Sequence, residues 1–285
     1  MTRPRRGRFD STQGPAPATL ATVMKLLRPL AILCLGLFFA ACQPADHPET
    51  LVVGMEMSYP PFEMRGTDNQ PDGISVRMAE NLADHLGRPL KLEDVAWDGI
   101  IPALQGGKID LIISSMTRTD ERAQAIDFSD GYVTNGLCML VGKDSKIESV
   151  DDLQESGYRV AVKLGTTGHL WAQGHLEGVE LVVLDEASVC ALEVAQGKAE
   201  AFIYDQVSIY KQWKTHTAAT RPILKPIREE TWAIGIQKGN DELREKVNAW
   251  LADFRAAGNF DQLAERYMAE EKAAFEEMGV PFIFH

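Results

Sequence analysis

The chain has 285 residues, of which 45% are hydrophobic and 25% are charged, a composition typical of a globular protein. Six of the 29 basic residues and one of the 41 acidic residues precede residue 42, so 23 basic and 40 acidic residues follow, a net charge of −17. This acidic balance argues against binding of nucleic acid and against electrostatic attachment to an anionic lipid surface.

The N-terminal segment is typical of a secretory signal. Lys25 and Arg28 precede an uncharged run over residues 30–41. The run is too short for a membrane span, which needs about 20 residues, but it suits the apolar region of a signal peptide. The run ends in Phe39-Ala40-Ala41-Cys42, and small residues before a cysteine resemble a bacterial lipobox.

We expect Cys42 to be the lipid-bearing first residue of the mature chain. Residues 1–41 would then be the leader and lipoprotein signal peptide, with Met24 as an alternative start, and residues 42–49 a polar tether. The alternative is ordinary signal cleavage beside an incidental cysteine. The first interpretation predicts a protein of the periplasm or cell envelope that is anchored to a membrane by its lipid.

Strands and helices alternate along the rest of the chain, which predicts an α/β fold. Helix boundaries are marked by Gly87 as a stop, and by Asp98 and Thr119 as N-caps. We expect strands at residues 51–54, 109–113, 159–162, 181–184, 201–205 and 234–236. We expect helices at 76–86, between the cap at 98 and Gly106, after the cap at 119, from about 169, and at 188–196, 241–256 and 260–268.

Two cysteines remain after Cys34 and Cys42 are assigned to the signal and the lipid anchor. Cys138 and Cys190 both lie in apolar surroundings, so two buried free thiols are favoured over a disulfide, which an oxidising compartment would permit. Cys/His spacing typical of a metal site is absent from the sequence, and we predict neither a metal nor a cofactor.

One stretch could hold a small carboxylate. The apolar strand at 109–113 ends in Ser114, Ser115 and Thr117, and Arg122 follows in the first turn of the next helix. Hydroxyls and backbone N–H groups at the carboxyl end of a strand bind anions, and arginine adds a bidentate, charge-assisted pair of bonds. The alternative is a set of solvated hydroxyls beside a surface arginine.

Two further positions could either bind a charged group of a ligand or have an ordinary structural role. The turn Lys163-Leu164-Gly165-Thr166-Thr167-Gly168 opens a helix, where free N–H groups suit an anion, but an ordinary strand-to-helix turn has the same pattern. Asp205 ends a buried strand, where it could cap the following helix or meet an ammonium group.

Eight short motifs occur in order along residues 50–270. They are Tyr-x-Pro-Phe-Glu at 59–63, Gly73-Ile74-Ser75-Val76, Trp97-x-x-x-Ile101-Pro102-Ala103-Leu104, Asp110-Leu-Ile-Ile, Thr117-x-Thr119-x-Glu121-Arg122, Ile126-Asp127-Phe128-Ser129, Val162-Lys163-x-Gly165-Thr166-Thr167 and Ala201-x-x-x-Asp205. Their order behind a lipobox resembles the extracytoplasmic solute-binding proteins of polar amino-acid ABC importers (solute-binding protein family 3). The chain departs from the usual Phe-Asp-x-Asp after Gly73, at a helix start that lies away from the ligand in that family.

The resemblance implies a two-lobe periplasmic-binding-protein-like fold of type II, in which each lobe is a doubly wound sheet. Lobe 1 would hold residues 50–132 and 233–285, and lobe 2 residues 137–228. Two crossing strands would form the hinge at 133–136 and 229–232. Sequence pattern alone does not predict that the chain returns to the first lobe.

The resemblance also implies a ligand site, residue by residue. Arg122 would pair with the α-carboxylate of an amino acid, helped by the hydroxyl and N–H of Thr117 and the N–H of Thr167. Asp205 and the Ser115 carbonyl would hold the α-ammonium group. The ligand's aliphatic part would lie between Tyr59 and Trp97. Its side-chain end would meet Glu56, Ser114 and Lys163, with His169 and Tyr204 as further candidates.

These residues predict capture of a small polar α-amino acid, with glutamine as the first choice, by lobe closure and without catalysis. The resemblance implies a membrane permease and its ATPase as partners, and this chain itself has no Gly-x-x-x-x-Gly-Lys-Ser/Thr loop that would bind ATP. Two alternatives stay open. One is a periplasmic dehydratase-type enzyme on the same fold, and the other is a ligand-binding receptor that signals through a membrane partner.

Overall fold

The computed structural model describes residues 49–154 and 157–284. The predicted signal peptide, Cys42 and nearly all of the tether lie outside the described residues. Among the helices that are described, none combines the length and hydrophobicity needed to cross a membrane.

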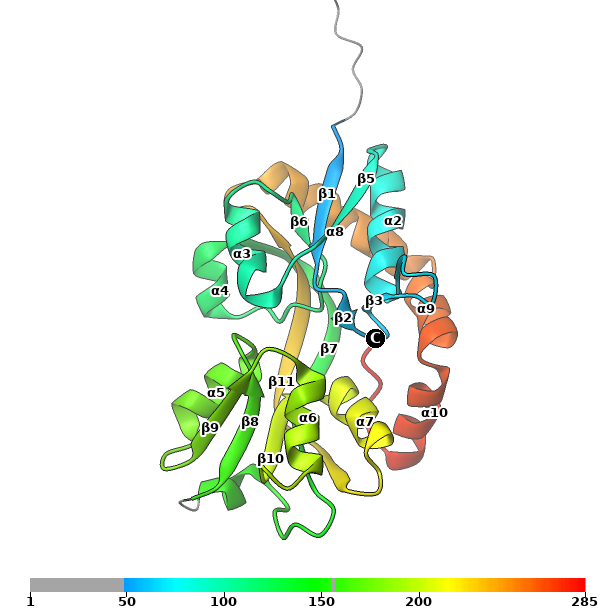
Figure 1. Cartoon of the computed structure of the whole chain (residues 1–285). Helices are drawn as coiled ribbons and strands as arrows, with labels where there is room; N and C mark the ends of the chain where they lie inside the picture. Colours follow the sequence, from blue (N-terminus) through cyan, green and yellow to red (C-terminus); the bar gives the residue numbers. More distant parts are fainter. Residues whose placement is uncertain (1–48, 155–156, 285) are drawn as a thin grey trace, which may run out of the picture. The chain divides into compact units, whose positions relative to one another are not determined.

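A mixed eight-stranded sheet forms the frame of the molecule (Figure 1). Its strand order is β5-β1-β6-β11-β7-β10-β8-β9, and a separate small sheet has the order β2-β3-β4. The strands are β1 (Leu51–Met55), β2 (Ser58–Tyr59), β3 (Glu63–Arg65), β4 (Pro71–Asp72), β5 (Leu90–Asp94), β6 (Leu111–Ile112), β7 (Asp127–Gly142), β8 (Arg159–Lys163), β9 (Glu180–Leu184), β10 (Ala201–Asp205) and β11 (Thr220–Ile236).

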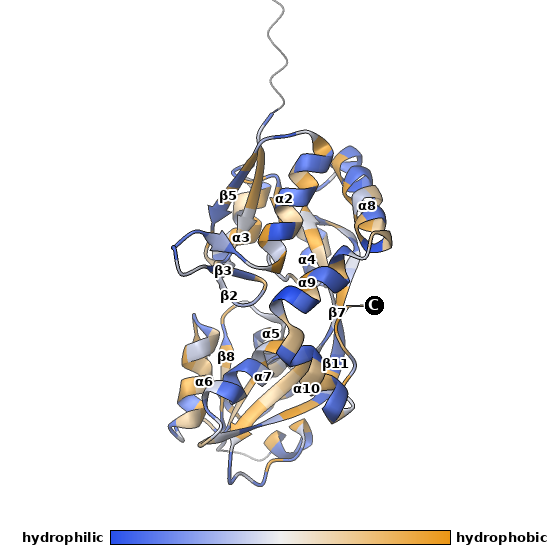
Figure 2. Cartoon of the chain, turned by 90° about the vertical axis from the view of Figure 1, so that its right-hand side faces the viewer, coloured by the Kyte–Doolittle hydropathy of each residue, from blue (hydrophilic) through white to orange (hydrophobic). Residues whose placement is uncertain are grey.

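Helices cover both halves of this sheet, as Figures 1 and 2 show from two directions. Many of their apolar residues are buried, such as Met78 and Leu251, whereas Val189 and Leu192 are exposed. The helices are α2 (Ile74–Leu86), α3 (Trp97–Gln105), α4 (Asp120–Ala125), α5 (Thr167–His175), α6 (Ala187–Ala195), α7 (Gln206–Thr215), α8 (Asp241–Ala256), α9 (Asn259–Tyr267) and α10 (Ala269–Met278), with a 3-10 turn η1 (Val150–Gln154).

The two long strands β7 and β11 join the two lobes. They pair antiparallel along most of their length, and the predicted hinge segments lie opposite one another: Gly136 pairs with Glu229, Asn135 with Glu230 and Thr134 with Thr231. At its C-terminal end β11 pairs with β6, so the chain does return to the first lobe. The two-lobe fold is therefore as expected, while the lobe boundaries given above stay predictions.

Each lobe has its own hydrophobic core. The first surrounds β1 and α2 and contains fully buried residues such as Leu51 and Ile74. The second surrounds β8 and β10 and contains Val160 and Ile203. The first core also includes Val207 and Tyr210 of α7, so the two lobes share apolar contacts beside the two crossing strands.

The C-terminal helix α10 is an element that the sequence patterns did not predict. Phe275 is fully buried against the Tyr210 ring of α7, with centroids 5.4 Å apart, and Glu271 accepts from Lys211 at 3.0 Å. The prediction placed residues 233–285 in lobe 1 and α7 in lobe 2. Phe275 belongs to the same buried cluster as Leu51 and Ile74, and it also packs on Tyr210, so α10 contacts both predicted lobes.

The helix caps show one correct and one incorrect prediction. Thr119 caps α4 as predicted, with its side chain accepting from the Arg122 N–H. Asp98 does not cap α3, which starts one residue earlier at Trp97, after Ala96, so that Asp98 lies in the first turn. Cys138 and Cys190 are free and buried, as predicted.

Candidate functional site

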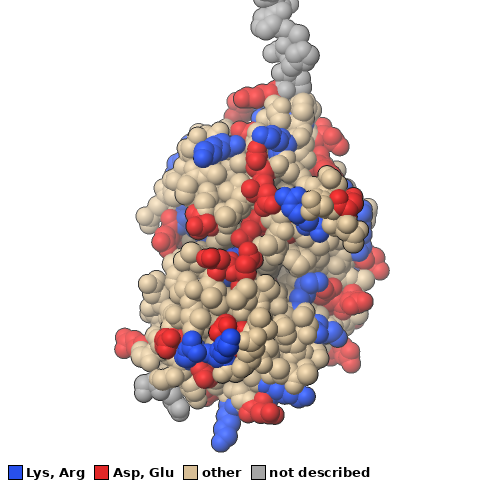
Figure 3. Space-filling model, viewed as in Figure 1, with Lys and Arg blue, Asp and Glu red and all other residues tan. Residues whose placement is uncertain are grey.

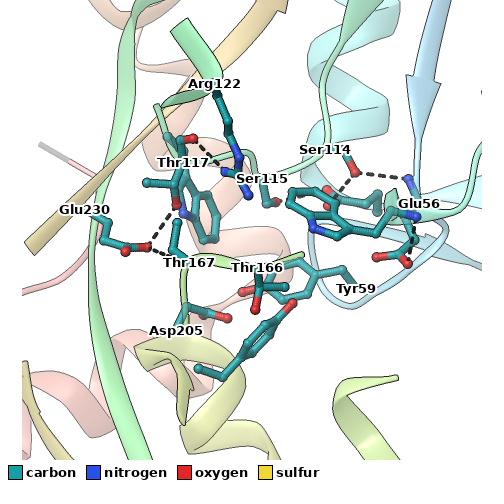
Figure 4. A pocket seen from close by; sticks show the side chains of 14 residues that line it. Glu56, Tyr59, Ser114, Ser115, Thr117, Arg122, Thr166, Thr167, Asp205 and Glu230 are labelled. Atoms are coloured by element: carbon teal, nitrogen blue, oxygen red, sulfur yellow. Dashed lines mark hydrogen bonds between the residues drawn. The ribbon is translucent and has the colours of Figure 1, made fainter. Parts of the chain in front are cut away.

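The lobes meet around a pocket that both of them line (Figure 4). It holds about 440 Å³ of space, part of it open to solvent. Nine of the ten predicted ligand-binding residues line it, Lys163 being the exception. The lining residues are Glu56, Tyr59, Glu63, Trp97, Ser114, Ser115, Thr117, Arg122, Thr166, Thr167, Tyr204, Asp205, Glu230 and Trp232.

Arg122 is the cation of the pocket. Its guanidinium is 7% exposed and donates from Nη1 to the Thr117 carbonyl at 2.7 Å. Nη2 donates across the lobes to the Gly165 carbonyl at 3.2 Å, and Cζ lies 5.2 Å from the centroid of the Trp97 ring. Burial lowers the pKa of Arg122 to about 10, which still leaves the side chain charged at neutral pH.

The N-terminus of α5 brings backbone N–H groups to the lining of the same pocket. Thr166 caps α5 by accepting from the His169 N–H at 3.4 Å, which leaves the first-turn N–H groups at Thr167 without an intrahelical partner. Gly168 packs so closely on β10 that an added Cβ would lie 2.6 Å from the Ile203 carbonyl oxygen. The N-terminus of α5 is therefore held firmly against the sheet and faces the pocket.

Asp205 caps α7, which was the first of its two predicted alternatives, and it also lines the pocket. Its Oδ1 accepts from the Ser208 N–H at 3.0 Å, which caps α7, and from Asn135 Nδ2 at 3.2 Å. The same carboxylate lines the pocket. Burial raises the pKa of Asp205 to about 6, so the carboxylate is ionised at neutral pH and gains from a cationic partner.

Aromatic rings form the apolar part of the pocket. Tyr59 lies 6.2 Å from Tyr204 and 5.9 Å from Trp232, in edge-on contacts. Trp97, the first residue of α3, lies on the arginine side. The rings come from both lobes and from β11, so the apolar contact surface is complete only when the lobes are together.

Lys163 and Glu56 form an ion pair across the lobes. Lys163 is 3% exposed, and Glu56 also accepts from the Trp97 N–H at 3.3 Å. Burial raises the pKa of Glu56, and the charge of Lys163 opposes that shift. We expected Lys163 to reach a ligand directly, but in the structure its ammonium is bonded to Glu56 and it lies outside the pocket lining.

His169, a further candidate, also lies outside the lining. Its Nδ1 accepts from the Gly165 N–H at 3.2 Å and so stabilises the turn before α5. Ser114 lines the pocket and accepts from the Glu56 N–H at 3.0 Å. Ser115, whose carbonyl was expected to face an ammonium group, has a left-handed backbone with φ of 49°.

Sequence analysis missed four lining residues: Glu63, Thr166, Glu230 and Trp232. Glu63 is 1% exposed and accepts from Ser75 and Ser115 hydroxyls at 2.6 and 3.1 Å. Burial raises the pKa of Glu63 to about 8. Glu63 lies in the first motif of the sequence, and Glu230 lies in the predicted hinge. An acidic residue within a hinge strand was the one sequence feature that pointed to Glu230.

Acidic side chains gather where the two lobes meet (Figure 3). A second cavity adjoins the pocket and shares Glu56 and Trp97 with it. Asp98, Asp185 and Glu186 also line that cavity. The approach beside Glu56 is therefore negatively charged.

Two α/β lobes on two crossing strands, with a pocket between them lined by the buried Arg122 and by several acids including Asp205, define a type II solute-binding protein. Residues 51–270 match the family described as bacterial extracellular solute-binding proteins, family 3, and the chain belongs to that family.

Named relatives extend over most of the chain. The L-cystine-binding protein TcyJ of Escherichia coli (strain K12) is 31% identical over 227 residues, covering 78% of this chain and 84% of that protein. The L-arginine-binding protein of Pseudomonas aeruginosa is 31% identical over 255 residues, covering 86% of this chain and 97% of that protein.

Solved structures share the fold. An ancestral arginine-binding protein bound to glutamine has a TM-score of 0.71 and 32% identity, covering 77% of this chain and 97% of that one. The ancestral amino acid-binding protein AncCDT-1, a precursor of cyclohexadienyl dehydratase, has a TM-score of 0.70 and 35% identity, covering 76% of this chain and 94% of that one.

Proposed function

We propose that this protein captures a small polar α-amino acid between its lobes and delivers it to an ABC importer. The observation that carries the proposal is the opposed pair Arg122 and Asp205, which line one pocket from different lobes. A buried guanidinium and a buried carboxylate complement the α-carboxylate and α-ammonium groups that every α-amino acid shares.

The relatives support this ligand class. Proteins named for binding cystine, arginine and histidine are similar over most of their length, and one similar structure holds glutamine. They support an amino acid and leave the side chain open, since their named ligands include both cationic and neutral members.

The side-chain end of the pocket favours an uncharged polar group. Glu56 and Lys163 already neutralise one another, so neither is a free partner for a charged ligand end. A neutral amide adds hydrogen bonds without adding a buried charge, which is why glutamine is our first choice. The acidic cavity beside Glu56 disfavours an acidic ligand further.

Capture works by lobe closure. Arg122 contacts the Gly165 carbonyl across the lobes, and Glu56 contacts Lys163 in the same way. A ligand bonded to both lobes adds to these contacts only in the closed form and so shifts the equilibrium by its difference in affinity for the two forms. A permease and its ATPase would then recognise the closed form.

Isothermal titration calorimetry with L-glutamine, L-arginine, L-histidine, L-cystine and L-glutamate tests this proposal. We expect L-glutamine to bind most tightly. Lys163→Ala frees Glu56 and should move the preference toward cationic amino acids, whereas Glu56→Gln frees Lys163 and should move it toward acidic ones. Unchanged preference in both variants would show that this pair does not face the ligand's side chain.

A dehydratase-type enzyme is the second candidate, and Glu63 favours it. The pocket holds a buried carboxyl whose pKa of about 8 keeps it protonated at neutral pH, as a general acid requires. One similar structure is also described as a precursor of cyclohexadienyl dehydratase. Incubation with prephenate or arogenate, followed by detection of an aromatic product, distinguishes the enzyme from the binding protein.

We also propose that Cys42 carries a lipid anchor and that the protein works in the cell envelope. The proposal rests on the charged start, the apolar run and the small residues before Cys42. Genes for a permease and an ATPase beside this one would favour import over a signalling receptor.

A further inference from the structure

Glu230 is a buried carboxylate at the centre of the hinge, and its four hydrogen bonds all come from side chains. Oε2 accepts from the hydroxyls of Thr117 at 2.9 Å and Thr167 at 2.8 Å (Figure 4). Oε1 accepts from Nε and Nη2 of Arg228 at 3.0 and 2.8 Å. The side chain of Glu230 is 4% exposed.

The two threonines belong to different parts of the molecule. The segment around Thr117 is tied to β11 by bonds from the Ala233 N–H to the Met116 carbonyl and from the Arg118 N–H to the Thr231 carbonyl, at 3.0 and 2.9 Å. Thr117 therefore moves with Glu230. Thr167 starts α5 in the other lobe, so its bond to Glu230 crosses between the lobes.

The Thr117 and Thr167 hydroxyls are not free to donate hydrogen bonds to a ligand. A threonine hydroxyl has one proton to donate, and here both protons go to Glu230. Neither hydroxyl can then donate to the α-carboxylate of a ligand, although we expected the Thr117 hydroxyl to do so. The donors left for that carboxylate are Arg122 and the backbone N–H groups.

We propose that Glu230 is a positioning residue that links ligand capture to lobe closure. It acts through Thr167: the bond between them fixes the first turn of α5 against the hinge, and thereby sets the N–H groups of that turn toward the ligand carboxylate. This inference rests on the proposed function as far as the ligand is concerned. The bond forms only when the lobes are together, so it slows opening and ligand release.

The test compares Glu230→Gln and Thr167→Val with Glu229→Gln, which removes the same charge from the adjacent, exposed hinge position. Thr167→Val deletes the hydroxyl but keeps the backbone N–H. Dissociation and association rates are measured by stopped-flow tryptophan fluorescence with L-glutamine and L-arginine as probes. A hydrogen bond to a charged group is lost, so dissociation should be faster by roughly tenfold in both test variants.

The pattern of effects separates this role from general destabilisation. Association rates should stay within about threefold of the wild type, because the bond is absent from the open form. The double variant should release the probe no faster than the worse single variant, since both remove one bond. Glu229→Gln should match the wild type. Additive effects, or equal effects in Glu229→Gln, would overturn the inference.

A readout without ligand keeps the two proposals apart. Because the bond stabilises only the closed form, ligand-free Glu230→Gln and Thr167→Val should populate that form less than the wild type, which small-angle X-ray scattering reports as a larger radius of gyration, and Glu229→Gln should match the wild type. Failure of the wild type to bind either probe would count against the proposed ligands alone. An equal radius of gyration in all four ligand-free proteins would overturn the role of Glu230, whatever the ligand.

Discussion

Replacing Arg122 with alanine should nearly abolish binding of the amino acid. The guanidinium is 7% exposed, and in the described part of the chain it faces the pocket together with the N-terminus of α5. Its removal leaves the ligand carboxylate buried without its charged partner. Loss of one member of a buried, hydrogen-bonded charge pair costs about 2–5 kcal/mol, which corresponds to roughly a 30- to 5,000-fold weaker affinity.

The substitution Arg122→Lys should recover little of that loss. Lysine keeps the charge, but its ammonium cannot make the planar two-bond fork to a carboxylate, and it would leave the Gly165 carbonyl without its donor. Arg118→Ala is the matched control, because Arg118 is an exposed arginine four residues earlier with no ion pair among the described residues.

Calorimetry measures the affinity of the wild type and of these three variants for the amino acid. We expect the wild type and Arg118→Ala to bind most tightly, Arg122→Lys more weakly, and Arg122→Ala most weakly. Near-normal affinity in Arg122→Ala would refute the assignment of Arg122 to the ligand carboxylate.

Three further predictions concern titration and location. Burial raises the pKa of Asp205 to about 6, and only the carboxylate attracts an ammonium group, so affinity should be constant above about pH 6 and fall by up to about tenfold per unit below it. Calorimetry across this range should show no such fall in Asp205→Asn. Burial raises the pKa of Glu63 to about 8, so the folded state holds a proton that the unfolded state loses above about pH 4.5. The free energy of unfolding should therefore decrease as pH rises between these values, by at most about 1.4 kcal/mol per unit; urea titrations in which Glu63→Gln shows the same decrease would contradict this. If Cys42 carries lipid, the protein should sediment with membranes and Cys42→Ser should not, whereas equal partitioning of both into the soluble fraction would refute the anchor.

The sequence was sufficient for local features whose physical cause is local. Thr119 could be recognised as a helix cap because its hydroxyl is placed just before a run with helical spacing, and it does accept from the Arg122 N–H. The bond from Arg122 to the Thr117 carbonyl joins residues only five positions apart and follows from the same helix start. Nine predicted ligand-binding residues line one pocket, because the resemblance brought in the topology that collects them.

Features that depend on contacts between distant segments could not be predicted in this way. Lys163 and Glu56 are separated by 107 positions, and nothing in either local pattern shows that they bond to each other before they bond to a ligand. Glu230 binds Thr117 and Thr167 from positions 113 and 63 residues away. An acid in a hinge strand resembles an exposed acid until the strand order is known.

The helix α10 was missed for a different reason. Its residues 269–278 carry five charged side chains, and three of its five apolar residues are alanines, so the pattern predicted no core-facing helix. Phe275 is its one fully buried large apolar residue, and it packs on Tyr210. A single anchoring aromatic is below what hydrophobic periodicity detects.

The central claim is that the pocket closes on a zwitterionic α-amino acid. A thermal-shift screen of residues 43–285 against the common amino acids tests it most directly, with N-acetyl and α-amide derivatives of each ligand found. A ligand at 100 times its dissociation constant adds about 2.7 kcal/mol to the free energy of unfolding. The account predicts stabilisation by polar α-amino acids, with glutamine foremost, and loss of stabilisation when either the ammonium or the carboxylate is blocked. Stabilisation by apolar amino acids alone, or by the blocked derivatives as much as by the parent compounds, would contradict it.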